Sequence, residues 1–356
     1  PAERAMIDAC CLVCGGVQHE TLASAAGIAD QKEMLRTFHQ QRRRPEAQAD
    51  LKDRTTFSQN DSTEVVRCVT CGFIYRNPRP RLGAVTAQYA DEKYGEEHLQ
   101  GEFESQHAWA ERKIPAFSKL CRFSSRAPVV VEVGSFVGGF LAAAQQKGWS
   151  ILGVDPGKEV VNFCQARGLP VFHGTLNDAT IAARSVDAVV IWNTFDQLVN
   201  PDTTLSAARR ILRHGGHLVL RVPNGEMFHQ GVQWLKANGG RRRWAILALA
   251  WNNLLSFPYL NGYSTSTLDQ LVARHGFTRV ALKVDTLMTL SDHQTTLWGR
   301  WEERVVKSSC RILAGNPLLF PSLQAMVSPW LDVYYVVRRD GVFVNRMSGT
   351  SRRSVR

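Results

Sequence analysis

The sequence predicts an α/β protein with a small cysteine-rich module near its N-terminal end. Short β-branched runs alternate with helical patterns from residue 127 onward, which is typical of a parallel sheet. Five of the eight cysteines lie within the first 71 residues, and four of these form two C-x2-C-G pairs. The 356 residues are 44% hydrophobic, so the chain can bury a large core and is long enough for about two domains.

The first predicted strand, at 127–133, is a β-branched run suited to burial on both faces of a sheet. A glycine-rich turn at 134–139 follows it, and a helix is expected at 140–147. The second strand ends at Asp155, about 20 residues after the turn, where an acid can accept both hydroxyls of a ribose. This second strand is predicted at 150–154, the later strands at 169–173, 186–192, 217–222, 278–284 and 330–338, and the other helices at 203–212 and 268–275.

The glycine-rich turn differs in two ways from the dinucleotide-binding G-x-G-x-x-G pattern. Phe136 stands where that pattern has its second glycine, which lets a pyrophosphate approach the backbone. Glu132 in the preceding strand would repel a phosphate but could hold the amino group of a zwitterionic ligand. The turn therefore favours an adenosine ligand with an amino-acid tail.

The two cysteine pairs have the spacing of metal-binding knuckles. Two residues between thiolates direct both sulfurs to one ion, and the following glycine relieves the turn. We expect a structural Zn²⁺ site with no open coordination position. Cys10 is then the spare thiol, unless it takes the place of Cys11 in a C-x3-C pair with Cys14. Chance burial of the cysteines and a redox role are the alternatives. The four expected ligands are Cys11, Cys14, Cys68 and Cys71.

The 53 residues between Cys14 and Cys68 exceed the usual ribbon spacing of about 15 to 20, so a segment must loop out between the knuckles. We expect it to be helical at 30–44, with Asp30 as the N-cap residue, and polar at 45–63.

The net charge of +11 favours an anionic partner. No apolar run is long enough for a transmembrane helix, and nothing near the first residue resembles a signal peptide, so we expect a cytoplasmic protein. The basic tail at 340–356 is not expected to bind nucleic acid, because aromatic residues do not alternate with its arginines.

Five segments, in this order, resemble class I S-adenosylmethionine-dependent methyltransferases that carry an N-terminal zinc-binding domain. Residues 131–140, Val-Glu-Val-Gly-Ser-Phe-Val-Gly-Gly-Phe, are similar to the first motif of that family. The other similar segments are 67–80, 153–156, 187–198 and 210–220. The resemblance implies a seven-stranded, mostly parallel Rossmann-like sheet with helices on both faces, plus a small N-terminal zinc-binding module.

The resemblance also suggests a division of the chain. The expected parts are a zinc-binding module with a helical insertion at 1–85, a helical linker or lid at 86–125, a methyltransferase domain at 126–339 and the basic tail at 340–356. Within the domain, an insertion at 224–263 is expected to shape the acceptor pocket, and a helical insertion is expected at 287–328. The basic, aromatic stretch of the 224–263 insertion could line that pocket, form a packed cover or rest on a membrane surface.

The resemblance assigns cofactor contacts residue by residue. Glu132 would bind the methionine amino group, Asp155 the ribose, and Asn193 would lie near the sulfonium and the methionine carboxylate. Thr175 stands where relatives often have an Asp for the adenine amino group, which leaves that contact to a backbone group or to Asn177. The complete expected cofactor set is Glu132, Gly134, Ser135, Phe136, Gly138, Asp155, Pro156, Thr175, Leu176 and Asn193.

Gln197 occupies the position where many relatives have a histidine that could serve as general base. Glutamine cannot take up a proton at neutral pH, so another group must act if a proton has to leave the nucleophile. The candidates are Asp196, Tyr94, His98 and His229, although Tyr94 could instead cover the cofactor.

These observations predict an S-adenosylmethionine-dependent methyltransferase that methylates an O or C nucleophile of a small-molecule or saccharide acceptor, which could be anionic. One alternative is a catalytically degenerate fold that serves as a zinc-dependent binding module, suggested by Phe136, Thr175 and Gln197. The other is an RNA or nucleic-acid methyltransferase, suggested by the charge.

Overall fold

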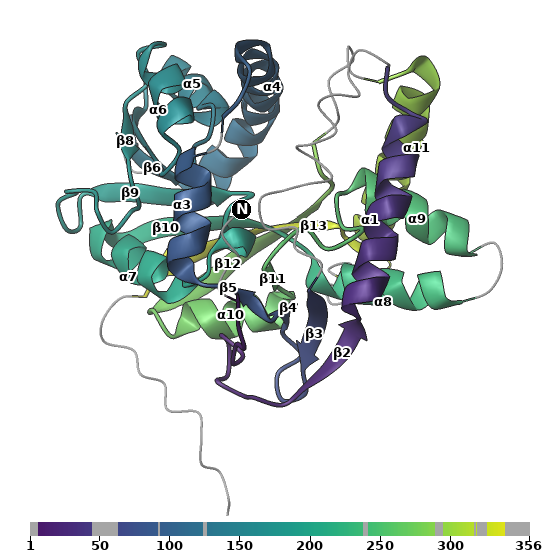
Figure 1. The fold of residues 1–356 in the computed structure, drawn as a ribbon. Coiled ribbons are helices and arrows are strands. Elements are labelled where there is room, and N and C mark those ends of the chain that lie inside the picture. Colours follow the sequence, from purple (N-terminus) through teal and green to yellow (C-terminus); the bar gives the residue numbers. More distant parts are fainter. Residues whose placement is uncertain are drawn as a thin grey trace, which may run out of the picture.

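A seven-stranded sheet forms the centre of the computed structural model (Figure 1). Its strand order is β12-β13-β10-β9-β6-β7-β8; β13 is antiparallel to both neighbours, and the other pairs are parallel, which confirms the mostly parallel sheet. The strands are β6 (Val129–Val133), β7 (Ser150–Asp155), β8 (Val171–His173), β9 (Val186–Trp192), β10 (Leu212–Pro223), β12 (Phe277–Asp285) and β13 (Trp330–Val337). The structure describes residues 6–44, 63–91, 93–123, 127–237, 241–288, 295–316, 318 and 326–338.

Helices cover both faces of this sheet, as expected, because successive strand residues point to opposite sides. Val131 and Val189 pack in one core with helices α7 and α10, whereas Val130 and Val190 pack in another with α4 and α5. The helices around the sheet are α3 (Leu82–Asp91), α4 (Glu96–Cys121), α5 (Gly139–Gln146), α6 (Lys158–Gln165), α7 (Pro201–Ile211) and α10 (Thr265–Ala273).

A second, antiparallel sheet contains the cysteine knuckles and has the strand order β11-β4-β3-β2. Its strands are β2 (His19–Ala23), β3 (Glu64–Cys68), β4 (Ile74–Asn77) and β11 (Asn261–Gly262), while β1 (Met6–Ile7) pairs separately with β5 (Arg79–Pro80). Strand β11 belongs to the expected insertion at 224–263. The buried Arg76 of β4 donates hydrogen bonds to the backbone oxygens of Tyr259 and Ser256, at 3.0 and 2.9 Å. The small sheet is therefore completed and held by the insertion.

Helices α1 (Ala25–Gln40), α8 (Gly225–Lys236), α9 (Arg241–Trp251) and α11 (Leu297–Ala314) lie beside the small sheet and share a core (Figure 1). Ala245, Leu249 and Trp251 of α9 are buried, so this stretch is a packed cover, although Trp244 is exposed. No helix in the described part of the chain is both long and apolar enough to cross a membrane.

The start and end predicted for the first of these helices were wrong. The N-cap residue of α1 is Ser24, which has an extended backbone and whose Oγ accepts a hydrogen bond from the N–H of Gly27 at 3.2 Å. Asp30 therefore lies inside the helix, which also ends at Gln40 instead of residue 44. The polar stretch at 45–62 and the tail at 340–356 lie outside the described residues.

Candidate functional site

The carboxyl ends of β6 and β9 meet at the centre of the large sheet, where β7 lies on one side of β6 and β9 on the other. Connections leave these strands in opposite directions, and this arrangement opens a crevice for ligands. The turn after β6 packs tightly on the loop after β9, because a Cβ added to Gly134 would lie 2.3 Å from Oγ1 of Thr194. Gly134 also has a φ of 72°, so a side chain there is excluded by space and by conformation.

Phe136 adopts the left-handed conformation, with a φ of 46°, although it is not a glycine. Its N–H donates to Oδ2 of Asp155 at 2.8 Å, and the N–H of Gly157 donates to Oδ1 at 2.9 Å. The ring of Phe136 packs edge-on against Tyr94 at 5.4 Å. The loop therefore bends without the middle glycine, and it is held by the hydrogen bond to Asp155 and by the ring contact between Phe136 and Tyr94.

Two buried side chains next to this turn have polar atoms without a partner among the described residues. Oε2 of Glu132 and Oγ of Ser135 are both enclosed and unbonded. Burial raises the pKa of Glu132 well above its usual value, and the negative charge of Asp155 adds to this effect. A cationic amino group at this position would satisfy the carboxylate, so these residues fit the methionine end of S-adenosylmethionine.

Asp155 lies at the end of β7, almost fully buried. Burial raises its pKa, against the effect of the hydrogen bonds from Gly157 and Phe136. Each carboxylate oxygen has a second lone pair, so Asp155 can still accept hydrogen bonds from the two hydroxyls of a ribose. The adjacent Pro156 has its carbonyl oxygen 3.0 Å from Nε2 of His173, which links the ends of β7 and β8.

The turn after β8 uses Thr175 for its own structure. The Thr175 hydroxyl and N–H both donate to Oδ2 of Asp178, at 2.6 and 2.9 Å, and these bonds lower the pKa of Asp178. Leu176 is buried in the core, while Asn177 is exposed. The sequence analysis did not identify Asp178, which a Thr-x-x-Asp turn signal could have revealed.

Asn193 follows β9 with a φ of 55°, and its Oδ1 accepts a hydrogen bond from Nε of Arg221 at 2.9 Å. Arg221 is fully buried, and its Nη1 lies 2.7 Å from both Asp285 and Asp332. Burial alone would lower the pKa of Arg221, but the two carboxylates outweigh it and raise the pKa. Lys113 of α4 pairs with the same two carboxylates. This balanced ionic network fixes the side-chain oxygen of Asn193 and leaves its NH₂ group for the crevice.

Asp196 and Gln197 lie next to each other in the 3₁₀ turn η2 (Phe195–Gln197) and are both buried. Nε2 of Gln197 donates to Oδ2 of Asp196 at 2.8 Å, whereas Oδ1 of Asp196 has no partner among the described residues. Burial raises the pKa of Asp196 to about 7, despite the hydrogen bonds that favour the carboxylate. Asp196 can therefore exchange a proton near neutral pH, which Gln197 cannot.

Asp196 and Gln197 belong to a larger group of buried polar side chains, which we call the acceptor-side cluster. Each member has at least one buried polar atom without a hydrogen-bond partner among the described residues. The members are Tyr75, Arg79, Asp196, Gln197, Asn261 and Tyr263. Tyr263 interacts electrostatically with Asp196 and with Arg79, which links η2 to β5.

Burial shifts the pKa values within the acceptor-side cluster. It raises the pKa of Tyr75 to about 12 and that of Tyr263 well above its usual value, so both hydroxyls stay protonated and can donate. Burial also lowers the pKa of Arg79. A pocket lining was one of the roles predicted for the insertion at 224–263, which contains Asn261 and Tyr263. Tyr75 and Arg79 were not predicted, because no local pattern links strands β4 and β5 to η2.

The other catalytic candidates occupy different places. Tyr94 stacks on His98 at 5.8 Å, and Tyr94 also contacts Phe136, on the cofactor side of the crevice. His229 lies on α8 with Nδ1 3.5 Å from the Glu226 carboxylate, and it contacts neither Tyr94 nor Asp196 within the described residues.

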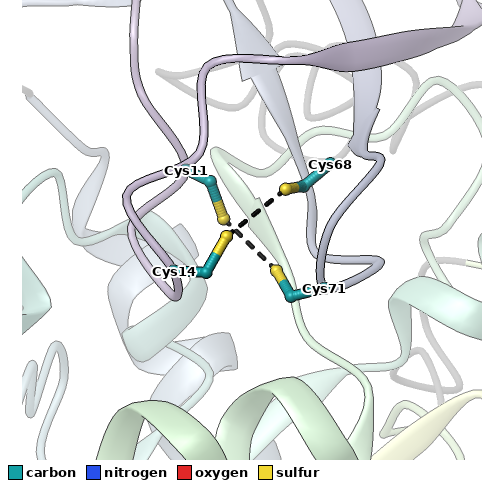
Figure 2. Close-up of side chains that lie close together, drawn as sticks. All are labelled: Cys11, Cys14, Cys68 and Cys71. Carbon is teal, nitrogen blue, oxygen red and sulfur yellow. Dashed lines mark hydrogen bonds between the residues drawn. The ribbon is translucent and has the colours of Figure 1, made fainter.

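The four cysteines of the two knuckles converge, as the spacing predicts. Figure 2 shows their sulfurs facing one another between two loops, and all four lie within 4.8 Å of one another. The Cys11–Cys71 and Cys14–Cys68 sulfur distances are 3.4 and 3.5 Å. A tetrahedral Zn²⁺ site with bonds of about 2.3 Å separates its sulfurs by about 3.8 Å, so this cluster fits such an ion. Cys10 is outside the cluster and exposed.

The backbone of each knuckle supports the sulfurs. Gly15 and Gly72 have φ values of 75° and 76°, as expected for glycines that relieve a tight turn. Burial raises the pKa of Cys68, but hydrogen bonds from the backbone of Cys71 and Thr70 outweigh it and lower the pKa to about 7. These backbone N–H groups would also stabilise a metal-bound thiolate.

Residues 104–282 match the family model described as a methyltransferase domain. Methyltransferase structures from Thermotoga maritima and Archaeoglobus fulgidus share 14% and 17% identity with this chain, with TM-scores of 0.40 and 0.42. They cover 67% and 68% of this chain, and 90% and 97% of their own chains are matched.

A chain in the complex between a methyltransferase activator and a methyltransferase from Haloferax volcanii is similar at 18% identity and a TM-score of 0.43, over 72% of this chain and 98% of that one. None of the curated proteins has a significantly similar sequence. Because the family match extends over half of the 356 residues, the chain belongs to the methyltransferase-domain family and is an S-adenosylmethionine-dependent methyltransferase.

Proposed function

We propose that this methyltransferase acts on an O or C nucleophile of a small-molecule or saccharide acceptor that carries a negative charge. The observation that carries this proposal is Asp196, a buried carboxylate with a free oxygen and a pKa of about 7 at the carboxyl end of β9. Asp196 comes two residues after Thr194 in the sequence, and Thr194 packs against Gly134 of the glycine-rich turn.

S-adenosylmethionine, when bound, supplies an electrophilic methyl group on a sulfonium. Glu132 and Ser135 would bind the amino group of the methionine moiety, and Asp155 would bind the ribose hydroxyls. Asn193, oriented by Arg221, would direct its NH₂ group toward the methionine carboxylate. Tyr94 would cover the glycine-rich turn through its contact with Phe136 and exclude water from the crevice.

Asp196 would act as general base. A hydroxyl or an acidic C–H group must lose its proton as the new bond forms, and a carboxylate with a pKa near the working pH accepts that proton efficiently. Gln197 would hold Oδ2 of Asp196 in place and leave Oδ1 directed at the nucleophile. Gln197 is therefore a positioning residue in this proposal.

The rest of the acceptor-side cluster would bind the acceptor. Two protonated tyrosine hydroxyls and the Asn261 amide suit a polyhydroxylated molecule, while Arg79 suits a carboxylate or phosphate substituent. Buried polar groups without partners are costly, so binding an acceptor that satisfies them is favourable.

The cysteine cluster would hold one structural Zn²⁺ with no open coordination position. It would join the loop before β2 to the turn between β3 and β4 and so keep Tyr75 and Arg79 in place. The ion would thus support acceptor binding without taking part in methyl transfer.

Methyl-labelled S-adenosylmethionine, offered with a panel of sugar nucleotides, sugar acids, phenolic acids and RNA, tests this proposal. We expect label in an anionic small molecule, attached to oxygen or carbon, and loss of that labelling in Asp196→Asn. The matched control is Asp202→Asn, since Asp202 is a half-exposed carboxylate on the adjacent helix α7. Label only in RNA, or equal loss in both variants, would contradict the proposal.

A further inference from the structure

Helix α11 has an inverted distribution of polar and apolar residues. Its acids face inward: Glu302 pairs with Arg42 at 2.6 Å and accepts the indole N–H of Trp251 at 3.0 Å, and Glu303 pairs with Lys307 at 2.5 Å. All of these helix residues are buried. The acidic side chains of the helix are therefore buried and bonded inside the protein.

The outward side of α11 carries large apolar residues. Trp298 and Trp301 are 57% and 56% exposed and stack on each other at 4.9 Å. Val305 and Ile312 are also exposed, and their spacing of four and eleven residues from Trp301 places them on the same side of the helix. We call Trp298, Trp301, Val305 and Ile312 the apolar stripe.

Arginines flank the apolar stripe on one side. Arg304 and Arg311 are exposed, seven residues apart, and Arg300 is half-exposed one turn before Arg304. Arg311 lies 3.8 Å from Asp285, yet half of its side chain remains accessible. With Glu302 and Glu303 turned inward, the charged residues that α11 presents outward are all cationic.

We propose that α11 docks this protein on an anionic membrane surface. Its tryptophans would enter the interfacial region, where amphipathic aromatic rings are favoured, and the arginines would reach the lipid phosphates along the edge of the stripe. The helix would lie in the plane of the surface and would not cross it.

The arginines favour a lipid surface over a second copy of the chain. Two copies packed antiparallel through the stripes would bring their Arg304 and Arg311 side chains to the same edge, and like charges at an interface are unfavourable. An anionic surface instead complements both the apolar stripe and its positive flank. Figure 1 shows α11 at the outside of the molecule, on the opposite side from α5 and α6, so docking leaves the helix after the glycine-rich turn uncovered.

Vesicle sedimentation of the full chain tests this inference, with phosphatidylcholine alone compared with vesicles that contain about 30% phosphatidylglycerol. We expect at least about tenfold stronger binding to the anionic vesicles, a blue shift of tryptophan fluorescence, and weakening as salt rises from about 0.1 to about 0.5 M. The double variant Trp298→Ser/Trp301→Ser should lower binding about tenfold or more, because its changes remove the inserted aromatic area.

The matched control is Trp244→Ser, since Trp244 on α9 is 55% exposed but lies outside the stripe. It should leave vesicle binding within about twofold of the parent. Because the substituted side chains are exposed, both variants should keep the thermal stability and S-adenosylhomocysteine affinity of the parent. Equal binding to both vesicle types, no loss in the double variant, or a dimer in solution that the double variant abolishes would overturn the proposal.

Discussion

The two sides of the methyltransferase crevice are built in different ways. On the cofactor side, β6, the glycine-rich turn, α5 and β7 follow one another along the chain, and Asp155 is bonded to the backbone of Phe136 and Gly157. On the acceptor side, strands β4 and β5 follow each other but lie far in the sequence from η2 and from β11, and these elements come together only in the fold. The cofactor side is held by local backbone geometry, whereas the acceptor side depends on how the small sheet packs against the large one.

This difference has a physical consequence. On the cofactor side, Asp155 is held by two backbone N–H groups and Asn193 by Arg221, so these two side chains are oriented before any ligand binds, while Glu132 and Ser135 keep polar atoms for a ligand that are unpartnered among the described residues. Within the described part of the chain, the acceptor-side cluster has unpartnered polar atoms on six side chains, of which five lie on β4, β5, η2 and β11 and one, Tyr263, directly follows β11. We therefore expect substitutions on one side to leave the other side's ligand affinity intact.

The largest effect is expected from Asp196→Asn. Loss of a general base lowers kcat about 10³-fold, while the affinity for S-adenosylmethionine stays within about twofold. In the parent, kcat should rise as the pH increases through about 7, because the base acts only after it has released its proton. Steady-state kinetics from pH 5 to 9 with the labelled acceptor, alongside Asp202→Asn, measure both effects.

A pH-independent parent rate, or an Asp196→Asn variant with full activity, would show that Asp196 is not the base. A parallel loss of cofactor affinity would show instead that the two sides are coupled.

The next largest effect concerns the metal that would hold the small sheet together. Purified parent protein should contain about one Zn²⁺ per chain, and Cys68→Ser should lose it and melt about 5 °C or more below the parent. Metal analysis and thermal melting provide the measurements. Cys10→Ser is the matched control because Cys10 lies outside the cluster, and it should keep both the metal and the melting temperature. A parent protein without metal, purified in the absence of chelator, would refute the site.

A smaller effect links Asp196 to stability. Its pKa is raised in the folded protein to about 7, so the folded state holds a proton that the unfolded chain has already released above about pH 4. That stabilisation is present at low pH and is lost as the pH rises through 7. Relative to Asp196→Asn, the parent's free energy of unfolding should fall by about 2 kcal/mol between pH 5 and 8. Urea unfolding of both proteins at these two pH values measures the difference. If the free energy of unfolding changed equally with pH in the parent and in Asp196→Asn, Asp196 would not have a raised pKa in the folded protein.

The smallest effect is expected from Arg79→Lys. Lysine keeps the charge but loses the planar fork that binds carboxylates and phosphates through two hydrogen bonds, so KM for an anionic acceptor should rise about tenfold with kcat within about threefold. A neutral analogue of the acceptor should show no such rise. Equal changes in KM for the charged and neutral acceptors would assign Arg79 a purely structural role.

The contrast between the two sides also explains what the sequence alone could predict. The glycine-rich turn, Asp155 and the cysteine knuckles are short patterns whose spacing encodes their geometry, and the predicted fold, family and cysteine convergence are confirmed. The roles assigned to Glu132, Asn193 and Asp196 remain predictions.

The missed residues are those whose partners are distant in the sequence. Arg79 and Tyr75 belong to a module that a local pattern identifies only as metal-binding, and their approach to Tyr263 depends on β11 joining β4. Arg221 in β10 shows no local sign that it orients Asn193. The start of α1 was missed for another reason, because Ser24 and Asp30 are both suitable N-cap residues and only packing selects between them.

Calorimetric titration with S-adenosylhomocysteine tests the central claim most directly, because it needs no acceptor. Parent protein and Asp196→Asn should bind it with affinities within about twofold, whereas Asp155→Ala should bind about 100-fold more weakly, from the loss of two charge-assisted hydrogen bonds. The thermal melting of Asp155→Ala shows that the variant is folded, and Asp202→Ala is the carboxylate control because Asp202 is half-exposed and lies outside the cofactor contacts. A parent protein that does not bind, or an Asp155→Ala variant that binds as tightly as the parent, would contradict the account.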